Sequence, residues 1–317
     1  MTMIVAFHSL LFYTGKWWHF GGVVIPLWEK SSRFLDSLDL SMFVFISGFL
    51  FAWLLIFKGK YREKIPFLMG KAKRLLIPYL FWGVFLVLMQ SSIHSWDLLL
   101  TGISHLWFLL MLFWIFCLTL LLQKLFLKSI SYIKIGIILV FAYLVWFLFN
   151  RLSDHHFFLC IESALSYLPS FLLGCFCASK NIWHFSEIKA KLILFVSLLV
   201  LAIYVFFYPQ LSYFLNDLLI RFLSYSAIVC MFTIMSRVNL SDKLLNKINR
   251  LDRLSMGVYI FNQIVINYIL LIPYAKEWLI IHYLIGPLVI FIVSLFIPLL
   301  LSLTFNRYKW LSWSIGG

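Results

Sequence analysis

A single histidine lies inside the first apolar stretch of the chain. His8 is enclosed by apolar residues in Met3-Ile-Val-Ala-Phe-His-Ser-Leu10. An ionisable side chain is costly inside a membrane span, which makes it a candidate for function. An imidazole accepts and returns a proton near neutral pH, as a general base acting on a hydroxyl must. The alternative is a hydrogen bond between helices, worth about 1 kcal/mol in a bilayer, and the sequence leaves both interpretations open.

A basic cluster precedes the third apolar stretch. Lys71, Lys73 and Arg74 are followed by Leu-Leu-Ile and then Pro78-Tyr79. A donor that carries several phosphates needs clustered Lys and Arg beside a hydrophobic entrance. The cluster therefore predicts a phosphate site, with Pro78 starting or kinking the helix. The alternative is an anchor that keeps this loop in the cytoplasm, which any such loop would show.

Asp39 begins the second long apolar stretch. Aspartate at a helix N-terminus accepts hydrogen bonds from free N–H groups and complements the helix dipole. Its second possible role is to orient His8 or to bind a sugar hydroxyl.

Three more polar residues lie where apolar stretches meet the predicted outer face: His105, Glu162 and Arg221. His105 either contacts an acceptor molecule bound at that face or is an interfacial histidine. Arg221 is spaced i,i+4 from Asp217, which predicts a local salt pair. Glu162 has no evident local partner. The His155-His156 pair would need further ligands to hold a metal, so we expect no metal site.

The elements that position these residues are predicted to be membrane-spanning helices. Apolar residues make up 63% of the 317 residues, and mean hydropathy is +0.99. Stretches of about 17–20 residues with almost no charge recur, the length that one helix needs to cross the hydrocarbon. The sequence predicts an all-α, polytopic membrane protein with ten spans, at roughly 1–14, 38–57, 75–91, 105–123, 133–149, 157–178, 192–208, 216–236, 255–272 and 283–305.

Most of the 26 Lys and Arg residues fall in alternate gaps between these stretches. Basic loops remain in the cytoplasm, so both termini are predicted to be cytoplasmic. The net charge of +14 then reflects topology and attraction to anionic lipid. Nucleic-acid binding is disfavoured, because the basic residues are dispersed over separate loops without a recognition motif.

The first stretch is shorter than a full span. Met1 to Tyr13 would cover about 20 Å of a hydrocarbon core of about 30 Å. We expect residues upstream of the given start to complete this helix. Without repeats or linkers, residues 1–317 are predicted to form a single membrane domain.

In this order the motifs resemble the acyltransferase 3 family of bacterial integral-membrane acyltransferases. The similarity rests on His8, Phe45-Ile-Ser-Gly-Phe49, Lys71-x-x-Arg74-Leu-x-x-Pro78-Tyr79, His105-Leu-Trp-Phe-Leu-Leu, Tyr167-Leu-Pro-Ser-Phe-Leu-Leu-Gly174 and Leu254-Ser-Met-Gly-Val-Tyr-Ile260. The resemblance includes the branch of fucose 4-O-acetylase-like proteins. It implies that His8 is catalytic and that Lys71 and Arg74 lie near the phosphates of an acyl-CoA.

The chain departs from the family pattern in three places. An Arg expected about ten residues before His8 has no counterpart, Lys71 stands where the family usually has Arg, and Asn262 stands where many relatives carry His.

The resemblance implies an O-acetyltransferase of the bacterial cell membrane. It would move an acetyl group from cytoplasmic acetyl-CoA to a hydroxyl of a surface or lipid-linked glycan. His8 would act as a general base or carry the acyl group briefly. The alternative is a flippase for a lipid-linked sugar, although the inverted repeats and broken helices common in transporters are not evident.

Overall fold

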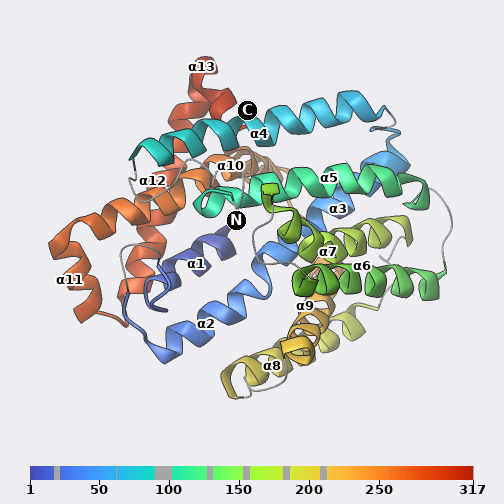
Figure 1. Cartoon of the computed structure of the whole chain (residues 1–317), viewed down its shortest axis with the longest axis horizontal. Coiled ribbons are helices and arrows are strands. Elements are labelled where there is room, and N and C mark those ends of the chain that lie inside the picture. The colour runs from blue at the N-terminus through green and yellow to red at the C-terminus, as the bar shows by residue number, and fades with distance from the viewer. Residues whose placement is uncertain are drawn as a thin grey trace. The chain divides into compact units, whose positions relative to one another are not determined.

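The computed structural model describes residues 1–17, 22–61, 63–89, 102–126, 131–152, 158–180, 186–207 and 213–316 (Figure 1). Within these ranges the chain is helical, and its β structure is limited to an isolated bridge between Thr14 and Val24. The all-α prediction is confirmed. The His155-His156 pair and most of the predicted outer loop 92–104 lie outside the described residues.

The α-helices are α1 (Thr2–Leu11), α2 (Pro26–Asp36), α3 (Asp39–Phe57), α4 (Lys64–Met89), α5 (Trp107–Phe126), α6 (Tyr132–Leu152), α7 (Ile161–Lys180), α8 (Glu187–Phe207), α9 (Tyr213–Met235), α10 (Asp242–Leu271), α11 (Pro273–Ile281), α12 (Gly286–Arg307) and α13 (Lys309–Ser312). In the described part of the chain, nine helical segments are long and apolar enough to cross a membrane. The remaining expected span, 1–14, corresponds to α1, a shorter apolar helix of 10 residues. The fold is that of a polytopic membrane protein.

Several helices extend beyond the apolar stretches that predicted them. α4 begins at Lys64 rather than near residue 75, and α10 begins at Asp242 rather than near residue 255. Absence of charge identifies the part of a helix inside hydrocarbon, whereas Lys, Arg and Leu continue a helix readily into water. Pro78 therefore lies inside α4 and does not start the helix. It still removes one N–H donor from the helical ladder.

The chain forms two compact units. The first unit combines Met1–Leu40 with Phe185–Ile315, and the second comprises Ser41–His184. In the first unit α10 packs along α12, α8 packs along α9, and α1 contacts α2, α10 and α12. In the second unit α4 packs on α5, while α7 packs on α5 and α6. The single membrane domain predicted from the sequence stays a prediction.

In the second unit, α3 and α7 approach each other at two glycines. A Cβ added at Gly48 would overlap the carbonyl oxygen of Phe171, and one added at Gly174 would overlap that of Phe45. Small residues allow this closeness between membrane helices. Gly48 and Gly174 therefore serve close helix packing, and two of the motifs that carry the family resemblance meet at this crossing.

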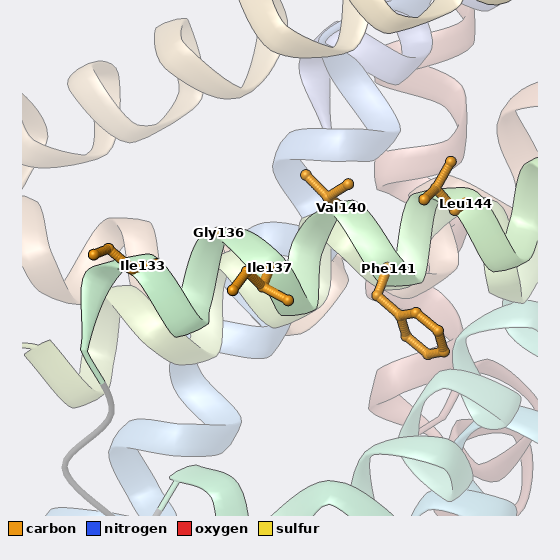
Figure 2. Close-up of a pocket in the computed structure, with 6 residues that line it drawn as sticks. All are labelled: Ile133, Gly136, Ile137, Val140, Phe141 and Leu144. Atoms are coloured by element: carbon orange, nitrogen blue, oxygen red, sulfur yellow. The ribbon is translucent and has the colours of Figure 1, made fainter.

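One face of α6 is apolar and open. Figure 2 shows Ile133, Gly136, Ile137, Val140, Phe141 and Leu144 along this helix, where they line a shallow groove. Ile133 and Phe141 are 77% and 66% exposed. All six residues are apolar, so the groove is suited to contact with lipid chains rather than to acid–base chemistry.

Candidate active site

The position of His8 is set by the end of α1. Phe12, Tyr13 and Trp17 follow the helix and are fully buried against Ile266 and Leu270 of α10, Leu279 of α11 and Ile290 of α12. Large aromatic side chains supply most of the apolar area in such a cluster. The cluster fixes the end of α1 against these helices.

Two polar contacts reinforce this apolar anchor. The Tyr13 hydroxyl donates to the carbonyl oxygen of Leu279 at 3.1 Å, and the Trp17 indole Nε1 donates to Oδ1 of Asn267 at 3.0 Å. Buried tyrosine and tryptophan need such partners for their polar atoms. These directional hydrogen bonds therefore help to fix the orientation of the N-terminal segment against α10 and α11.

α10 is held close to α12 at Gly257. A Cβ at this glycine would overlap the hydroxyl of Ser302, whose own proton is donated to the carbonyl of Pro298 at 2.7 Å. The close approach fixes the position of α10 little more than one turn before Asn262. The helix that carries Asn262 is thus fixed both to α12 and to the segment after α1.

His8 meets Asn262 inside this unit. Nδ1 of His8 lies 2.8 Å from Oδ1 of Asn262, although 254 positions separate the two residues. An amide oxygen can only accept, so Nδ1–H of the neutral imidazole is the donor. The basic nitrogen of that tautomer is Nε2, the atom that a general base would use. His8 is 8% exposed and Asn262 is fully buried.

In the sequence, Asn262 stands out as a departure from the family pattern and has no predicted role. The orienting role considered for Asp39 is filled at Nδ1 of His8 by this amide. No local signal links residues so distant in the chain, and only the packing of α1 on α10 brings them together.

Asp39 lies at the first position of α3 and is buried. Its Oδ1 accepts from the backbone N–H of Leu40. This contact fits the expected helix-terminal role, in which a carboxylate satisfies a free N–H group. The second oxygen, Oδ2, is buried and has no hydrogen-bond partner among the described residues.

Arg221 forms the salt pair expected from its spacing. Its Nε donates to Oδ2 of Asp217 at 2.7 Å within α9, and both side chains are largely buried. A charge in a membrane span is usually paired in this way. The pair accounts for both residues structurally, and a contact of Arg221 with an acceptor stays a prediction.

In the second unit, Lys71 is surrounded by aromatic rings. Its ammonium lies 4.1 Å from the ring centroid of Phe116, 5.5 Å from that of Phe67 and 6.0 Å from that of Tyr61. These are cation–π distances. We call Tyr61, Phe67 and Phe116 the aromatic cluster around Lys71. Lys71 is half-buried among these rings, whereas Lys73 and Arg74 are exposed on the same helix.

Tyr61 joins this cluster from the connection between α3 and α4. Its φ of 63° follows Gly59 at 62°, both in the left-handed region, so the chain turns sharply there. Nε2 of Gln123 donates to the Tyr61 carbonyl at 3.3 Å. Burial raises the pKa of the Tyr61 hydroxyl, and the positive charge of Arg74 partly offsets that rise. The positive charge of Arg74 therefore acts on the Tyr61 side chain.

His105 and Glu162 both lie in the second unit. His105 is buried in the short helical turn Ser104–Leu106, and its Nδ1 lies 3.4 Å from the Ser104 hydroxyl. Glu162 lies in the first turn of α7 and is half-buried. Their roles toward an acceptor stay predictions. No group of three metal-binding side chains occurs among the described residues.

A comparison with known families identifies the class of this protein. The family model described as an acyltransferase domain, acyltransferase 3, matches residues 1–307. The chain therefore belongs to this family, and the resemblance inferred from its motifs is confirmed at that level. No curated protein and no solved structure matches the chain. The family and the nine long apolar helices in the described ranges together define a membrane acyltransferase.

Proposed function

We propose that this acyltransferase moves an acetyl group from acetyl-CoA to a hydroxyl of a surface or lipid-linked glycan at the bacterial cell membrane. The observation that carries the proposal is the buried pair His8–Asn262 in a chain of this family. The hydrogen bond at Nδ1 makes Nε2 the basic atom of a buried imidazole. The flippase alternative is disfavoured, because the family assignment supports acyl transfer.

The proposed reaction is a direct transfer with His8 as general base. The acceptor hydroxyl gives its proton to Nε2 while its oxygen bonds to the thioester carbonyl carbon, and the carbonyl electron pair moves onto oxygen. When the carbonyl re-forms, the C–S bond breaks. The proton on His8 then passes to the departing thiolate, which leaves as the CoA thiol.

The proposed donor contacts lie on α4. Lys73 and Arg74 are exposed and positively charged, as residues that bind the phosphates of CoA must be. Lys71 adds a third charge beside them, held by the aromatic cluster. The guanidinium of Arg74 suits bidentate binding of a phosphate, whereas a lysine acts as a point charge.

The test follows labelled acetyl groups from acetyl-CoA into membrane glycans and glycolipids. We expect wild-type membranes to yield labelled product, and we expect mild alkali to release the label because an oxygen ester is formed. His8→Ala should lower the rate by about 10²–10⁴-fold, the usual cost of losing a general base. His282→Ala is the matched control, since His282 is an exposed histidine stacked on Trp278.

Equal transfer by wild-type and His8→Ala membranes would show that His8 is not the base. Label that resists alkali would show an amide product and would exclude a hydroxyl acceptor. Label bound covalently to wild-type protein but not to His8→Ala would replace direct transfer by an acyl-histidine intermediate.

A further inference from the structure

The side-chain amide of Asn262 has two different hydrogen-bonding ends, and only one end is engaged. Oδ1 accepts from His8, whereas Nδ2 is buried and has no hydrogen-bond partner among the described residues. Leaving a buried donor unpaired is unfavourable, and such exceptions in folded proteins call for an explanation. The donor belongs to the same planar amide that holds the candidate base.

We propose that Asn262 is a further catalytic residue, whose Nδ2–H donates to the thioester carbonyl oxygen as that oxygen becomes negatively charged. This inference rests on the proposed function. Oδ1 fixes the tautomer and orientation of His8, so one amide would position the base and stabilise the oxyanion. Fixed donors aimed at a developing charge act strongly in a site with little water.

The surroundings of Asn262 favour such a rigid role. The residue is fully buried on α10, which is held near α12 by the close approach at Gly257 and to the N-terminal segment by the Trp17–Asn267 bond. A donor held by packing needs little reorganisation when charge develops. Asparagine also keeps this donor at every physiological pH, because its amide does not titrate.

The proposal is tested by two substitutions of similar size. Asn262→Leu removes both ends of the amide and should lower kcat by about 10²–10³-fold, the usual cost of losing one oxyanion donor. KM for acetyl-CoA should change less than about threefold, because the lost contact acts mainly in the transition state. Asn216→Leu is the matched control. It removes an asparagine that accepts from Tyr204 elsewhere in the same unit and should leave kcat unchanged.

Asn262→Asp separates the donor role from a positioning role. A carboxylate can still accept from Nδ1–H of His8, as in catalytic triads, but it has no proton to donate. A residue that only positions His8 would keep nearly full activity in this variant at pH 8–9. The oxyanion role instead predicts a large loss there. Any remaining activity should fall as pH rises, because only a protonated carboxyl can donate, whereas wild-type activity should not fall over the same range, because the amide does not titrate.

The same variants are assayed for hydrolysis of acetyl-CoA without an acceptor, measured by thiol release. Hydrolysis passes through the same oxyanion, so this measurement does not depend on the identity of the glycan. Matching losses in hydrolysis and transfer support the inference. Asn262→Asp activity within threefold of wild type at pH 8–9 overturns it while the proposed function stands. Wild-type hydrolysis without any glycan labelling would instead contradict the proposed acceptor alone.

Discussion

Gly48 of α3 and Gly174 of α7 each lie against the backbone of the opposite helix. A Cβ at either position would overlap a carbonyl oxygen, that of Phe171 or that of Phe45. Two further contacts bridge the same helices, since Cys175 Sγ donates to the Gly48 carbonyl at 3.2 Å and the Ser170 hydroxyl donates to the Ser41 carbonyl at 2.6 Å. The crossing is therefore a structural centre of the second unit.

We expect Gly48→Ala and Gly174→Ala each to destabilise the protein by about 1–3 kcal/mol, because backbone cannot yield as a flexible side chain can. Gly136→Ala is the control. No atom lies within 4 Å of a Cβ built at Gly136, which is labelled in Figure 2, so alanine should be neutral or should stabilise the helix by up to about 1 kcal/mol. Thermal unfolding in detergent measures all three. Equal melting temperatures for Gly48→Ala and Gly136→Ala would contradict the close crossing.

The predicted phosphate site is tested through the donor KM. Arg74→Ala should raise KM for acetyl-CoA about tenfold, which corresponds to ~1.4 kcal/mol. Lys71→Met should raise it less, because the Lys71 ammonium is engaged by the ring of Phe116. Binding should also weaken as salt rises, since exposed charges are screened. Lys64→Ala, an exposed lysine at the start of the same helix, is the control.

If Arg74→Ala folds and leaves KM for acetyl-CoA unchanged, the basic residues Lys71, Lys73 and Arg74 serve only to keep this segment in the cytoplasm. Loss of affinity in Lys71→Met equal to that in Arg74→Ala would show that Lys71 leaves the aromatic cluster to bind phosphate.

Two ion pairs with the same spacing should differ in their effect on stability. Arg221–Asp217 is largely buried, with side chains 17% and 23% exposed, whereas Arg33 in the Arg33–Glu29 pair is 51% exposed. Arg221→Met removes the cation that pairs with the largely buried Asp217 carboxylate and should cost about 3–5 kcal/mol. Arg33→Met should change stability by less than about 1 kcal/mol. Thermal unfolding measures the stability of both variants. Similar losses of stability would mean that burial does not determine how much an ion pair stabilises the protein.

The spans could be predicted from the sequence because transfer into hydrocarbon depends on local composition alone. Helix ends could not, because α4 and α10 continue into polar sequence that the same criterion rejects. α2 was missed for a related reason, since it mixes Glu29 and Arg33 with apolar residues. Pro26 at its first turn was an available signal of a helix start.

In the candidate site, too, some residues could be predicted from the sequence and others could not. His8 was identifiable because a histidine in an apolar stretch is conspicuous in the sequence. Its partner Asn262 was not, because the pairing depends on how α1 packs against α10. The aromatic cluster around Lys71 also depends on tertiary structure, since Phe116 comes from α5 and Tyr61 from a sharp turn.

The orientation predicted from charge can be tested at the two ends of α10. The basic residues in the first turns of α10 place Asn246 in the cytoplasm, and the segment after α10 is then outside, with Tyr274. Both side chains are exposed, Tyr274 by 83%. With the five native cysteines replaced by alanine, an impermeant maleimide on whole cells should label Tyr274→Cys and not Asn246→Cys. After permeabilisation both should react, which controls for accessibility. Labelling of Asn246→Cys alone on intact cells would show that the orientation is opposite to the predicted one. It would also contradict the cytoplasmic position proposed for Lys73 and Arg74.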